Sequence, residues 1–242
     1  SPFIQKRLKS KLVTCSSDIE KEIMHNHLGF DYKYLEVTGY ARFDGLKDNS
    51  KGEKEIMIMP TLGAGMIDLT VKTFQESTLL KNLSTLFYNK ELGSFLERKK
   101  YIIKLILHPS MNKYFKYIKT NSKNIVILKP GAESIDQMLC NAKLLITDYS
   151  SIAWDMLYMG KEVIFYDFSD AERNFNSYIN LDTKMPGYKA KNIEDLVSLI
   201  ASEEENNFKI PEKFEKEIGK YFAFNDSNNS QRIWSAISKH NL

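Results

Sequence analysis

The turn Thr-Asp-Tyr-Ser-Ser, residues 147–151, lies between an apolar run, LLI, and an amphipathic stretch, IAWDMLYM. A helix N-terminus presents unpaired N–H groups and a partial positive charge, so hydroxyls there can add donors around a phosphate or pyrophosphate. Thr147, Asp148, Ser150 and Ser151 are therefore candidate substrate-binding residues. The alternative is that Asp148 or Ser150 only caps the helix and that Ser151 has no role.

His108 is the candidate catalytic residue. It follows the apolar run YIIKLIL and precedes Pro109, which restricts it to an extended conformation and ends the strand there. An imidazole at the carboxyl end of a strand can donate to a developing negative charge or act as a general acid toward a leaving group. The sequence leaves open the alternative of a solvated loop histidine.

Two further turns follow apolar runs. In PTLGAG, residues 60–65, Gly63 and Gly65 allow the backbone to approach a ligand closely, beside the hydroxyl of Thr61. In YDFSDAERN, residues 166–174, Asp170 and Arg173 could meet ribose hydroxyls and phosphate. The alternatives are a flexible turn, since PTLGAG is neither a dinucleotide-binding nor a P-loop pattern, and an ordinary polar surface loop.

Arg42 lies in VTGYARFDGL, residues 37–46, shortly before Asp44. Its guanidinium carries the fork of donors that suits a phosphate. The alternative is an ion pair with Asp44.

A parallel sheet flanked by helices would bring these turns together, because ligands collect outside the carboxyl ends of its strands. The sequence predicts this α/β, doubly wound fold, since short apolar runs alternate with longer amphipathic stretches. Strands are expected at residues 11–16, 34–39, 55–60, 101–108, 124–129, 143–148 and 162–167. Helices are expected at residues 18–28, in one long stretch within 68–98, at 134–142, 151–159 and 193–205, and twice in 213–239. Asp18 and Ser134 are the expected N-caps, and Gly160 is the expected residue after a helix end.

The apolar pattern also predicts a division of the chain. A charged segment with glycines, residues 45–54, reads as a linker. Residues 1–44 hold two strands and one helix, too little for an independent domain, so we expect them to be the end of a domain that begins earlier. Residues 55–220 supply a complete doubly wound sheet, and residues 221–242 a final helix.

The composition indicates a globular chain, since 43% of its 242 residues are hydrophobic and none of its apolar runs reaches the roughly 18 residues of a membrane-spanning helix. The net charge of +3 is too small to indicate a nucleic-acid partner. Cys15 and Cys140 are expected to be reduced core thiols of a cytosolic protein. No Cys/His spacing indicates a metal site, and no cofactor is expected.

The order of these motifs resembles the CDP-glycerol glycerophosphotransferase family, the polymerases and primases of teichoic acids and capsules. The matching stretches, from residue 11 to the C-terminus, are GYARFDGL, MPTLGAG, LHPS, LITDYSSIAWDML, FYDFSDAERN, MPG and FNDSNNSQRI. The resemblance implies a GT-B fold of two Rossmann-like domains that face a cleft. It assigns residues 1–44 to the end of the acceptor-side domain, residues 55–220 to the domain that binds a CDP-alditol, and residues 221–242 to a helix that crosses back.

The resemblance also implies roles. Ser150 and Ser151 would hold the donor pyrophosphate, and His108 would stabilise charge on it or on the departing CMP. Arg42 and Arg173 would be further phosphate contacts. The remaining substrate-binding candidates are Thr61, Gly63, Thr147, Asp148 and Asp170. An acceptor hydroxyl would attack the glycerol-bearing phosphorus and displace CMP, with positioning and electrostatic stabilisation supplying most of the catalysis.

The sequence departs from the family pattern in two places. The family's Trp-His-Gly motif, whose His is the expected general base, does not occur in these 242 residues. If the residues are a piece of a longer protein, the base lies outside them. Leu62 and Gly63 follow Thr61 where the family has a basic residue, so donor contacts there are expected from backbone amides, and the identity of the alditol stays open.

We therefore predict a transferase that moves glycerol phosphate or another alditol phosphate from CDP-glycerol or CDP-ribitol to a hydroxyl of a growing, lipid-linked teichoic-acid-like or capsular polymer, releasing CMP. The expected location is the cytoplasm. A peripheral contact between the basic start of the chain and the inner face of the membrane is left open. The alternatives are a GT-B glycosyltransferase that uses a nucleotide sugar and a non-catalytic nucleotide-binding module.

Overall fold

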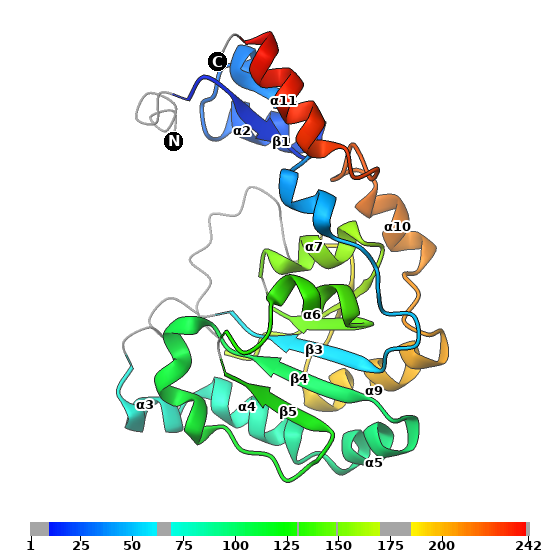
Figure 1. The fold of residues 1–242 in the computed structure, drawn as a ribbon. Helices are drawn as coiled ribbons and strands as arrows, with labels where there is room; N and C mark the ends of the chain where they lie inside the picture. Colours follow the sequence, from blue (N-terminus) through cyan, green and yellow to red (C-terminus); the bar gives the residue numbers. More distant parts are fainter. Residues whose placement is uncertain (1–9, 62–68, 130, 149, 170–184, 241–242) are drawn as a thin grey trace. The chain divides into compact units, whose positions relative to one another are not determined.

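The computed structural model describes residues 10–61, 69–129, 131–148, 150–169 and 185–240 (Figure 1). The chain divides into two compact units. Unit 1 comprises residues 1–47, 176–186 and 211–242, and unit 2 comprises residues 48–175 and 187–210. The predicted domains, residues 1–44, 45–54, 55–220 and 221–242, stay predictions.

Unit 2 contains a six-stranded parallel sheet in the order β5-β4-β3-β6-β7-β8. Its strands are β3 (Glu55–Met59), β4 (Ile102–Ile106), β5 (Ile125–Leu128), β6 (Leu144–Thr147), β7 (Glu162–Phe165) and β8 (Tyr188–Lys189). Counted along the unit this order is 3-2-1-4-5-6, that of a doubly wound Rossmann-like sheet. The predicted α/β fold is confirmed, as are the first five of these strands; the two-residue β8 has no counterpart among the predicted ones.

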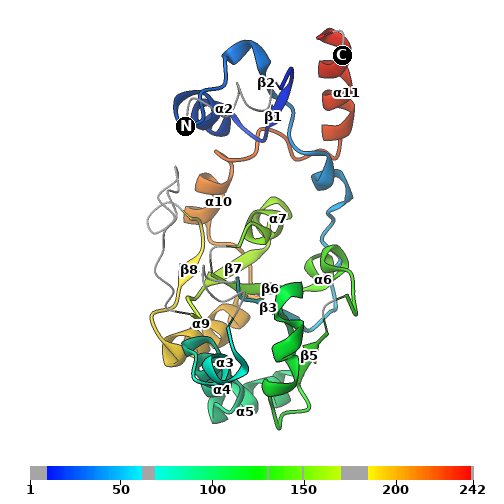
Figure 2. The same cartoon turned by 90° about the vertical axis from the view of Figure 1, so that its left-hand side faces the viewer.

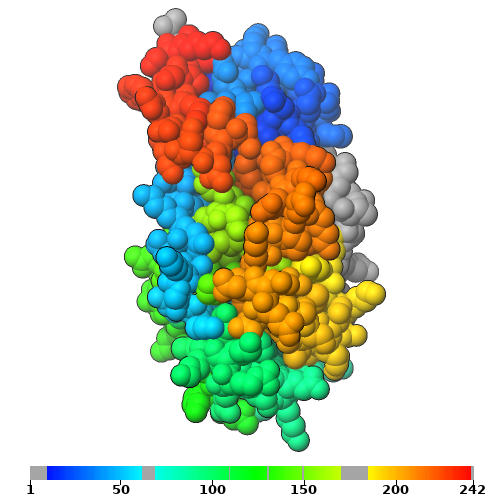
Figure 3. All heavy atoms as spheres, turned by 90° about the vertical axis from the view of Figure 1, so that its right-hand side faces the viewer, coloured from blue at the N-terminus to red at the C-terminus, as the bar shows by residue number. Residues whose placement is uncertain are grey.

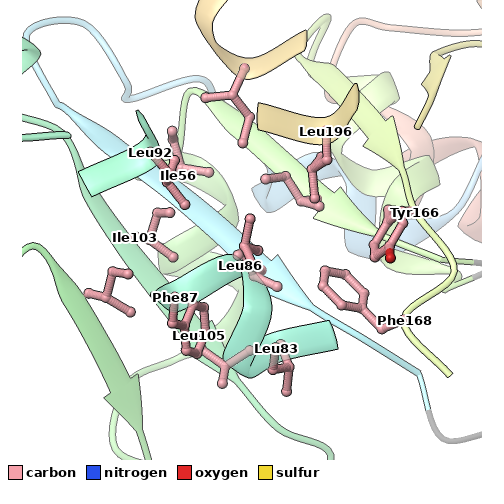
Figure 4. Packing of buried hydrophobic residues seen from close by; sticks show 14 of the residues in the cluster. Ile56, Leu83, Leu86, Phe87, Leu92, Ile103, Leu105, Tyr166, Phe168 and Leu196 are labelled. Carbon is pink, nitrogen blue, oxygen red and sulfur yellow. The ribbon is translucent and has the colours of Figure 1, made fainter. Parts of the chain in front are cut away.

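Helices cover both faces of this sheet (Figure 2), which is why every residue of its central strands β6 and β7 is buried. On one face lie α4 (Thr78–Phe87), α5 (Lys90–Lys99) and α9 (Ile193–Glu205); on the other lie α6 (Ile135–Asn141) and α7 (Ile152–Tyr158). Figure 4 shows the core of the first face, where Ile56 and Ile103 of the sheet meet Leu86 of α4 and Leu196 of α9.

The single long helix predicted within residues 68–98 is wrong. The segment forms three helices, α3 (Val71–Gln75), α4 and α5. Thr70, Ser77 and Asn89 precede them, and each side chain accepts a hydrogen bond from the backbone N–H three residues later. These caps restart the chain in new directions, so α4 and α5 can both pack on the sheet. Figure 3 shows α5 next to α9 on the surface of unit 2.

The predicted helix ends have mixed outcomes. Gly160 follows α7 at φ +69°, so its prediction as the residue after the helix end is confirmed. Ser134 stands at the N-cap of α6, but its side chain makes no capping hydrogen bond. The prediction for Asp18 is wrong by one residue, since Ser17 caps the helix and its side chain accepts from the N–H of Glu20. Asp18 is the first helical residue, where a carboxylate favours the helix dipole.

A buried lysine fixes the start of unit 2. Lys161 is only 4% exposed, and its ammonium donates to the carbonyl oxygens of Leu139 and Cys140, both at 2.7 Å, at the end of α6. The same ammonium lies 3.2 Å from the carboxylate of Asp48, and the N–H of Asn49 donates to Cys140 at 2.9 Å. Part of the segment predicted as a linker is therefore anchored to unit 2.

Unit 1 contains two parallel strands, β1 (Val13–Cys15) and β2 (Leu35–Val37), connected by α2 (Asp18–Asn26) and the short η1 (Tyr32–Tyr34). Its other elements are η2 (Ala41–Gly45), α10 (Glu212–Ile218) and α11 (Asn229–Lys239). Its small core is formed by Cys15, Phe30 and Leu35. Cys15 and Cys140 are both free and buried, as predicted.

Two of the family-like stretches, GYARFDGL and FNDSNNSQRI, lie against each other in unit 1. The carboxylate of Asp44 accepts from the backbone N–H groups of Asn229 (2.9 Å) and Ser230 (2.8 Å) and from the Asn229 amide (2.8 Å). Gly39, at φ +72°, leaves room for Asn229, because a Cβ there would lie 2.0 Å from its side-chain oxygen. These residues therefore hold the N-terminus of α11.

Candidate functional site

The topology places the predicted residues of unit 2 that the structure describes at one edge of the sheet. His108 follows β4, Thr61 follows β3, and the turn of residues 147–151 follows β6. These strands are neighbours, and β3 and β6 form the point where the strand order reverses. Ligands of doubly wound sheets bind in the crevice outside the carboxyl ends of the strands at this reversal. Figure 2 views unit 2 from that side.

Thr61 and Asp148 join the ends of β3 and β6. The N–H of Thr61 lies 2.9 and 3.0 Å from the two carboxylate oxygens of Asp148, and the Thr61 hydroxyl donates to the same carboxylate at 2.5 Å. One residue earlier, the Thr147 hydroxyl donates to the carbonyl oxygen of Met59 at 2.6 Å. The polar groups of Thr147 and Asp148 are thus engaged within the protein, and their predicted contact with a substrate stays a prediction.

Asp148 is buried, with 3% of its surface exposed. Burial raises the pKa of its carboxyl above the ordinary value, the hydrogen bonds from Thr61 lower the pKa, and the charge of Asp167 raises it again. The hydroxyl contact of 2.5 Å lies in the range of hydrogen bonds to an ionised oxygen. Thr61 therefore compensates part of the cost of a buried carboxylate.

Ser150 and Ser151 lie just before α7. Ser151 occupies the N-cap position, but its side chain makes no capping hydrogen bond, and both oxygens of Asp148 are turned to Thr61. The alternative of a helix cap at Asp148 or Ser150 is therefore not supported, since neither occupies the N-cap position. Ser151 is exposed, and Ser150 is 8% exposed. Together with the first N–H groups of α7, the hydroxyls could supply donors to an anion.

His108 is exposed and precedes η3 (Pro109–Tyr117) as its N-cap. Its Nδ1 accepts from the backbone N–H of Ser110 at 3.3 Å and lies 2.7 Å from the Ser110 hydroxyl. An accepting Nδ1 carries no proton, so the neutral ring has its proton on Nε2. Ser110 thereby orients the ring and prepares Nε2–H as a donor. Ser110 was not among the predicted site residues, although its position two residues after the histidine is the signal that identifies it.

The remaining predicted residues are either not described by the structure or belong to unit 1. Gly63, Asp170 and Arg173 lie outside the described residues. Arg42 is an exposed residue of unit 1, and its guanidinium carbon lies 5.0 Å from the centre of the Phe43 ring. A neighbour that sequence reasoning missed is Asn82, whose amide donates to the carbonyl oxygen of Phe168 at 2.9 Å and fixes the chain after β7.

None of the helices in the described part of the chain is both long and apolar enough to cross a membrane. Within the same residues, no cluster of three or more His, Cys, Asp and Glu side chains could hold a metal ion.

Comparison with known proteins gives a family match over nearly the whole chain. The sequence model of the family described as CDP-glycerol:poly(glycerophosphate) glycerophosphotransferase matches residues 3–239. The chain is 27% identical over 237 residues to the minor teichoic acid biosynthesis protein GgaB of Bacillus subtilis, covering 93% of this chain and 26% of the relative. It is 29% identical over 150 residues to the teichoic acid ribitol-phosphate primase of Bacillus spizizenii, covering 61% and 37%. The chain thus spans about a quarter to a third of the length of these relatives.

Solved structures show the same fold. The wall teichoic acid polymerase TagF matches with a TM-score of 0.70 at 18% identity, covering 98% of this chain and 60% of that one. A UDP-N-acetylglucosamine 2-epimerase-like protein of Listeria monocytogenes matches with a TM-score of 0.60 at 15% identity, covering 96% and 60%. Both neighbours are of the GT-B type, so the predicted GT-B fold is confirmed, with the second domain only partly present in this chain.

Proposed function

Because the chain belongs to the CDP-glycerol:poly(glycerophosphate) glycerophosphotransferase family, we propose that it takes part in the transfer of an alditol phosphate from a CDP-alditol to a hydroxyl of a teichoic-acid-like or capsular polymer. The observation that carries the proposal is the meeting of the Pro-Thr and Thr-Asp-Tyr-Ser-Ser turns at the strand-order reversal, through the Thr61–Asp148 hydrogen bonds. In this fold that reversal is where a nucleotide diphosphate would lie.

In the proposed reaction the oxygen of the acceptor hydroxyl attacks the alditol-bearing phosphorus. The bond from that phosphorus to the bridging oxygen breaks, and CMP leaves with both electrons of that bond. Ser150 and Ser151, with the first N–H groups of α7, hold the diphosphate. His108 donates its Nε2–H to the oxygen on which the negative charge develops, and Ser110 keeps the ring in the tautomer that can do so.

Thr61 and Asp148 have a positioning role in this proposal. Their hydrogen bonds fix the two turns relative to each other, and catalysis by positioning requires groups to be held before the substrate arrives. The base that takes the proton of the acceptor hydroxyl is not assigned to a residue of this chain. A cytoplasmic location is also part of the proposal. It agrees with a CDP-linked donor and with the two free cysteines.

The test is thermal unfolding of the chain with CDP-glycerol, CDP-ribitol, CDP and a set of UDP-sugars. A ligand at about 100 times its Kd adds roughly 2.7 kcal/mol to the free energy of unfolding, which for a chain of this size raises the Tm by roughly 5–10 °C. The variant Ser150→Ala/Ser151→Ala should lose the shift. The matched control, Ser198→Ala/Ser202→Ala on the exposed side of α9, should keep it.

The outcomes separate the alternatives. A shift with CDP compounds that the site variant loses and the control keeps supports the proposal. A shift with UDP-sugars alone indicates a glycosyltransferase instead. An equal shift in both variants removes Ser150 and Ser151 from the binding site.

A further inference from the structure

The net charge of +3 is unevenly distributed along the chain, because one long segment contains no acidic residue. Between Glu97 and Glu133 the sequence contains no Asp or Glu. The same segment contains nine cationic residues, Arg98, Lys99, Lys100, Lys104, Lys113, Lys116, Lys119, Lys123 and Lys129. Such an asymmetry within one unit produces a local positive field that the charge of the whole chain does not reveal.

Five of these lysines, Lys113, Lys116, Lys119, Lys123 and Lys129, form what we call the lysine strip. All five are exposed. Lys123 approaches Glu97 at 3.8 Å, both side chains being well exposed. For the other four, no carboxylate of the described residues lies within ion-pair distance. The charge of the strip is therefore largely unneutralised and available to an anion.

The ammonium groups of three lysines of the strip lie over aromatic rings. The ammonium groups of Lys113 and Lys116 lie 4.9 and 5.1 Å from the ring centres of the residues that follow each of them. Lys129 lies 5.9 Å from the ring centre of Phe115. Phe115 is half-buried. Cation–π contacts of this kind restrict the lysine side chains, so less conformational entropy is lost when an anion binds.

The strip follows one flank of unit 2. Figure 1 shows β5 at one edge of the sheet, in agreement with the strand order. The connection from β4 to β5 starts at His108, passes through η3 and returns to the amino end of β5. In a 3-10 helix residues three apart lie on one side, about 6 Å from each other, so Lys113 and Lys116 form a short ladder. Lys119 follows two residues after the end of η3. Lys129 follows β5 at the same edge as His108.

We propose that the lysine strip binds a linear polyanion, the anionic acceptor polymer, alongside the site where its terminal hydroxyl reacts. The identity of this partner rests on the proposed function; the positive surface itself does not. A ladder of single charges on the connection that follows His108 suits a chain of phosphodiesters laid along the flank. A bilayer would favour protruding apolar side chains, but Phe115 and Tyr117 are half-buried. Single-stranded nucleic acid would favour an exposed stacking ring, which the described residues of the strip do not offer.

The experiment measures fluorescence anisotropy of a labelled poly(glycerol phosphate) oligomer with the whole chain, over a range of salt concentrations. Each lysine–phosphate contact contributes about 0.7–0.9 to the slope of log affinity against log salt. The variant Lys113→Gln/Lys116→Gln/Lys119→Gln should therefore lower the slope by about two and weaken binding at least about tenfold at low salt. The matched control neutralises Lys81, Lys90 and Lys191, three exposed lysines elsewhere in unit 2, and should change the affinity less than twofold.

Two further probes, vesicles with phosphatidylglycerol and single-stranded DNA of equal charge, test the choice of partner. Polymer binding that depends on the strip and exceeds binding to both probes supports the inference. Equal losses in the strip and control variants, or no loss in either, overturn it. Tighter binding of vesicles or DNA with the same lysine dependence assigns the strip to another partner. Strip-dependent polymer binding without any Tm shift by CDP compounds leaves the strip standing and refutes the proposed donor site.

Discussion

Removal of the Thr61 hydroxyl tests whether the candidate site is built on a hydrogen-bonded carboxylate. In Thr61→Val the N–H of residue 61 still reaches Asp148, so only the contact of 2.5 Å is lost. A hydrogen bond to a charged group contributes about 1.5–3 kcal/mol, and we expect the free energy of unfolding at neutral pH to fall by that amount. Thr85→Val is the control: Thr85 is exposed and bonds only within α4, so its effect should stay within about 0.5 kcal/mol.

The pH dependence of the free energy of unfolding gives a second test of this prediction. The folded-state pKa of Asp148 is raised, so its contribution is most favourable below the ordinary Asp pKa of about 3.9 and declines as the pH rises through the folded-state value. Thr61→Val removes a group that lowers this pKa, so the decline should extend to higher pH. Below the ordinary pKa the carboxyl is neutral, and the mutational loss should shrink to about 0.5–1.5 kcal/mol.

Tryptophan fluorescence can follow unit 2 alone. The chain has two tryptophans, Trp154 in α7 of unit 2 and Trp234 in α11 of unit 1. In a Trp234→Phe background, urea unfolding monitored at Trp154 gives the stability of the unit that carries the site. A loss below about 0.5 kcal/mol at neutral pH, or a pH profile identical to that of the parent protein, would refute the compensation we ascribe to Thr61.

Three further predictions concern stability. Lys161→Met should lower the free energy of unfolding of unit 2 by about 1–3 kcal/mol in urea, because two carbonyl oxygens at the end of α6 lose their donor. The hydrogen bond from Lys239 lowers the pKa of Glu36. Glu36→Gln should therefore cost unit 1 about 0.5–1 kcal/mol at neutral pH and nothing once the pH has fallen through that pKa, as pH-dependent unfolding would show. Gly187→Ala should cost about 1–3 kcal/mol, since φ is +150° and a Cβ would lie 2.6 Å from a β7 carbonyl oxygen, whereas Gly93→Ala in open space within α5 should add about 0.5–1 kcal/mol in the same assay.

The described strands other than β8 were predictable because buried parallel strands are short runs rich in apolar residues. The helices between β3 and β4 were not, because the apolar period continues across Ser77 and Asn89. The signal was present, since Ser and Asn are the residue types that restart a helix. The prediction gave more weight to the length of the apolar pattern than to these two residues. The two-residue β8 exists only because it pairs with β7, which no local pattern reveals.

The candidate site was predictable as a set of turns but not as a network. The doubly wound pattern places the ends of β3, β4 and β6 at one edge, so Thr61, His108 and Ser150 could be grouped from the sequence. The bond between Thr61 and Asp148 joins residues 87 positions apart and depends on strand register. Sequence alone therefore described Asp148 as a helix cap or a ligand, and neither description includes its contact with Thr61.

The family-like motifs thus contain two kinds of residue. Asp148 and Asp44 direct their carboxylates at backbone and side-chain donors of distant turns, at residues 61 and 229, and so hold the fold of each unit. Ser151 makes no capping bond, and the tautomer of His108 leaves Nε2–H as a donor. Substitution of the first kind should lower stability and ligand binding together, because a misplaced turn loses both. Substitution of the second kind should lower ligand binding at unchanged stability, because exposed groups outside the core contribute little to folding. Measurement of both quantities on each variant therefore separates the residues that build the site from those that touch the substrate.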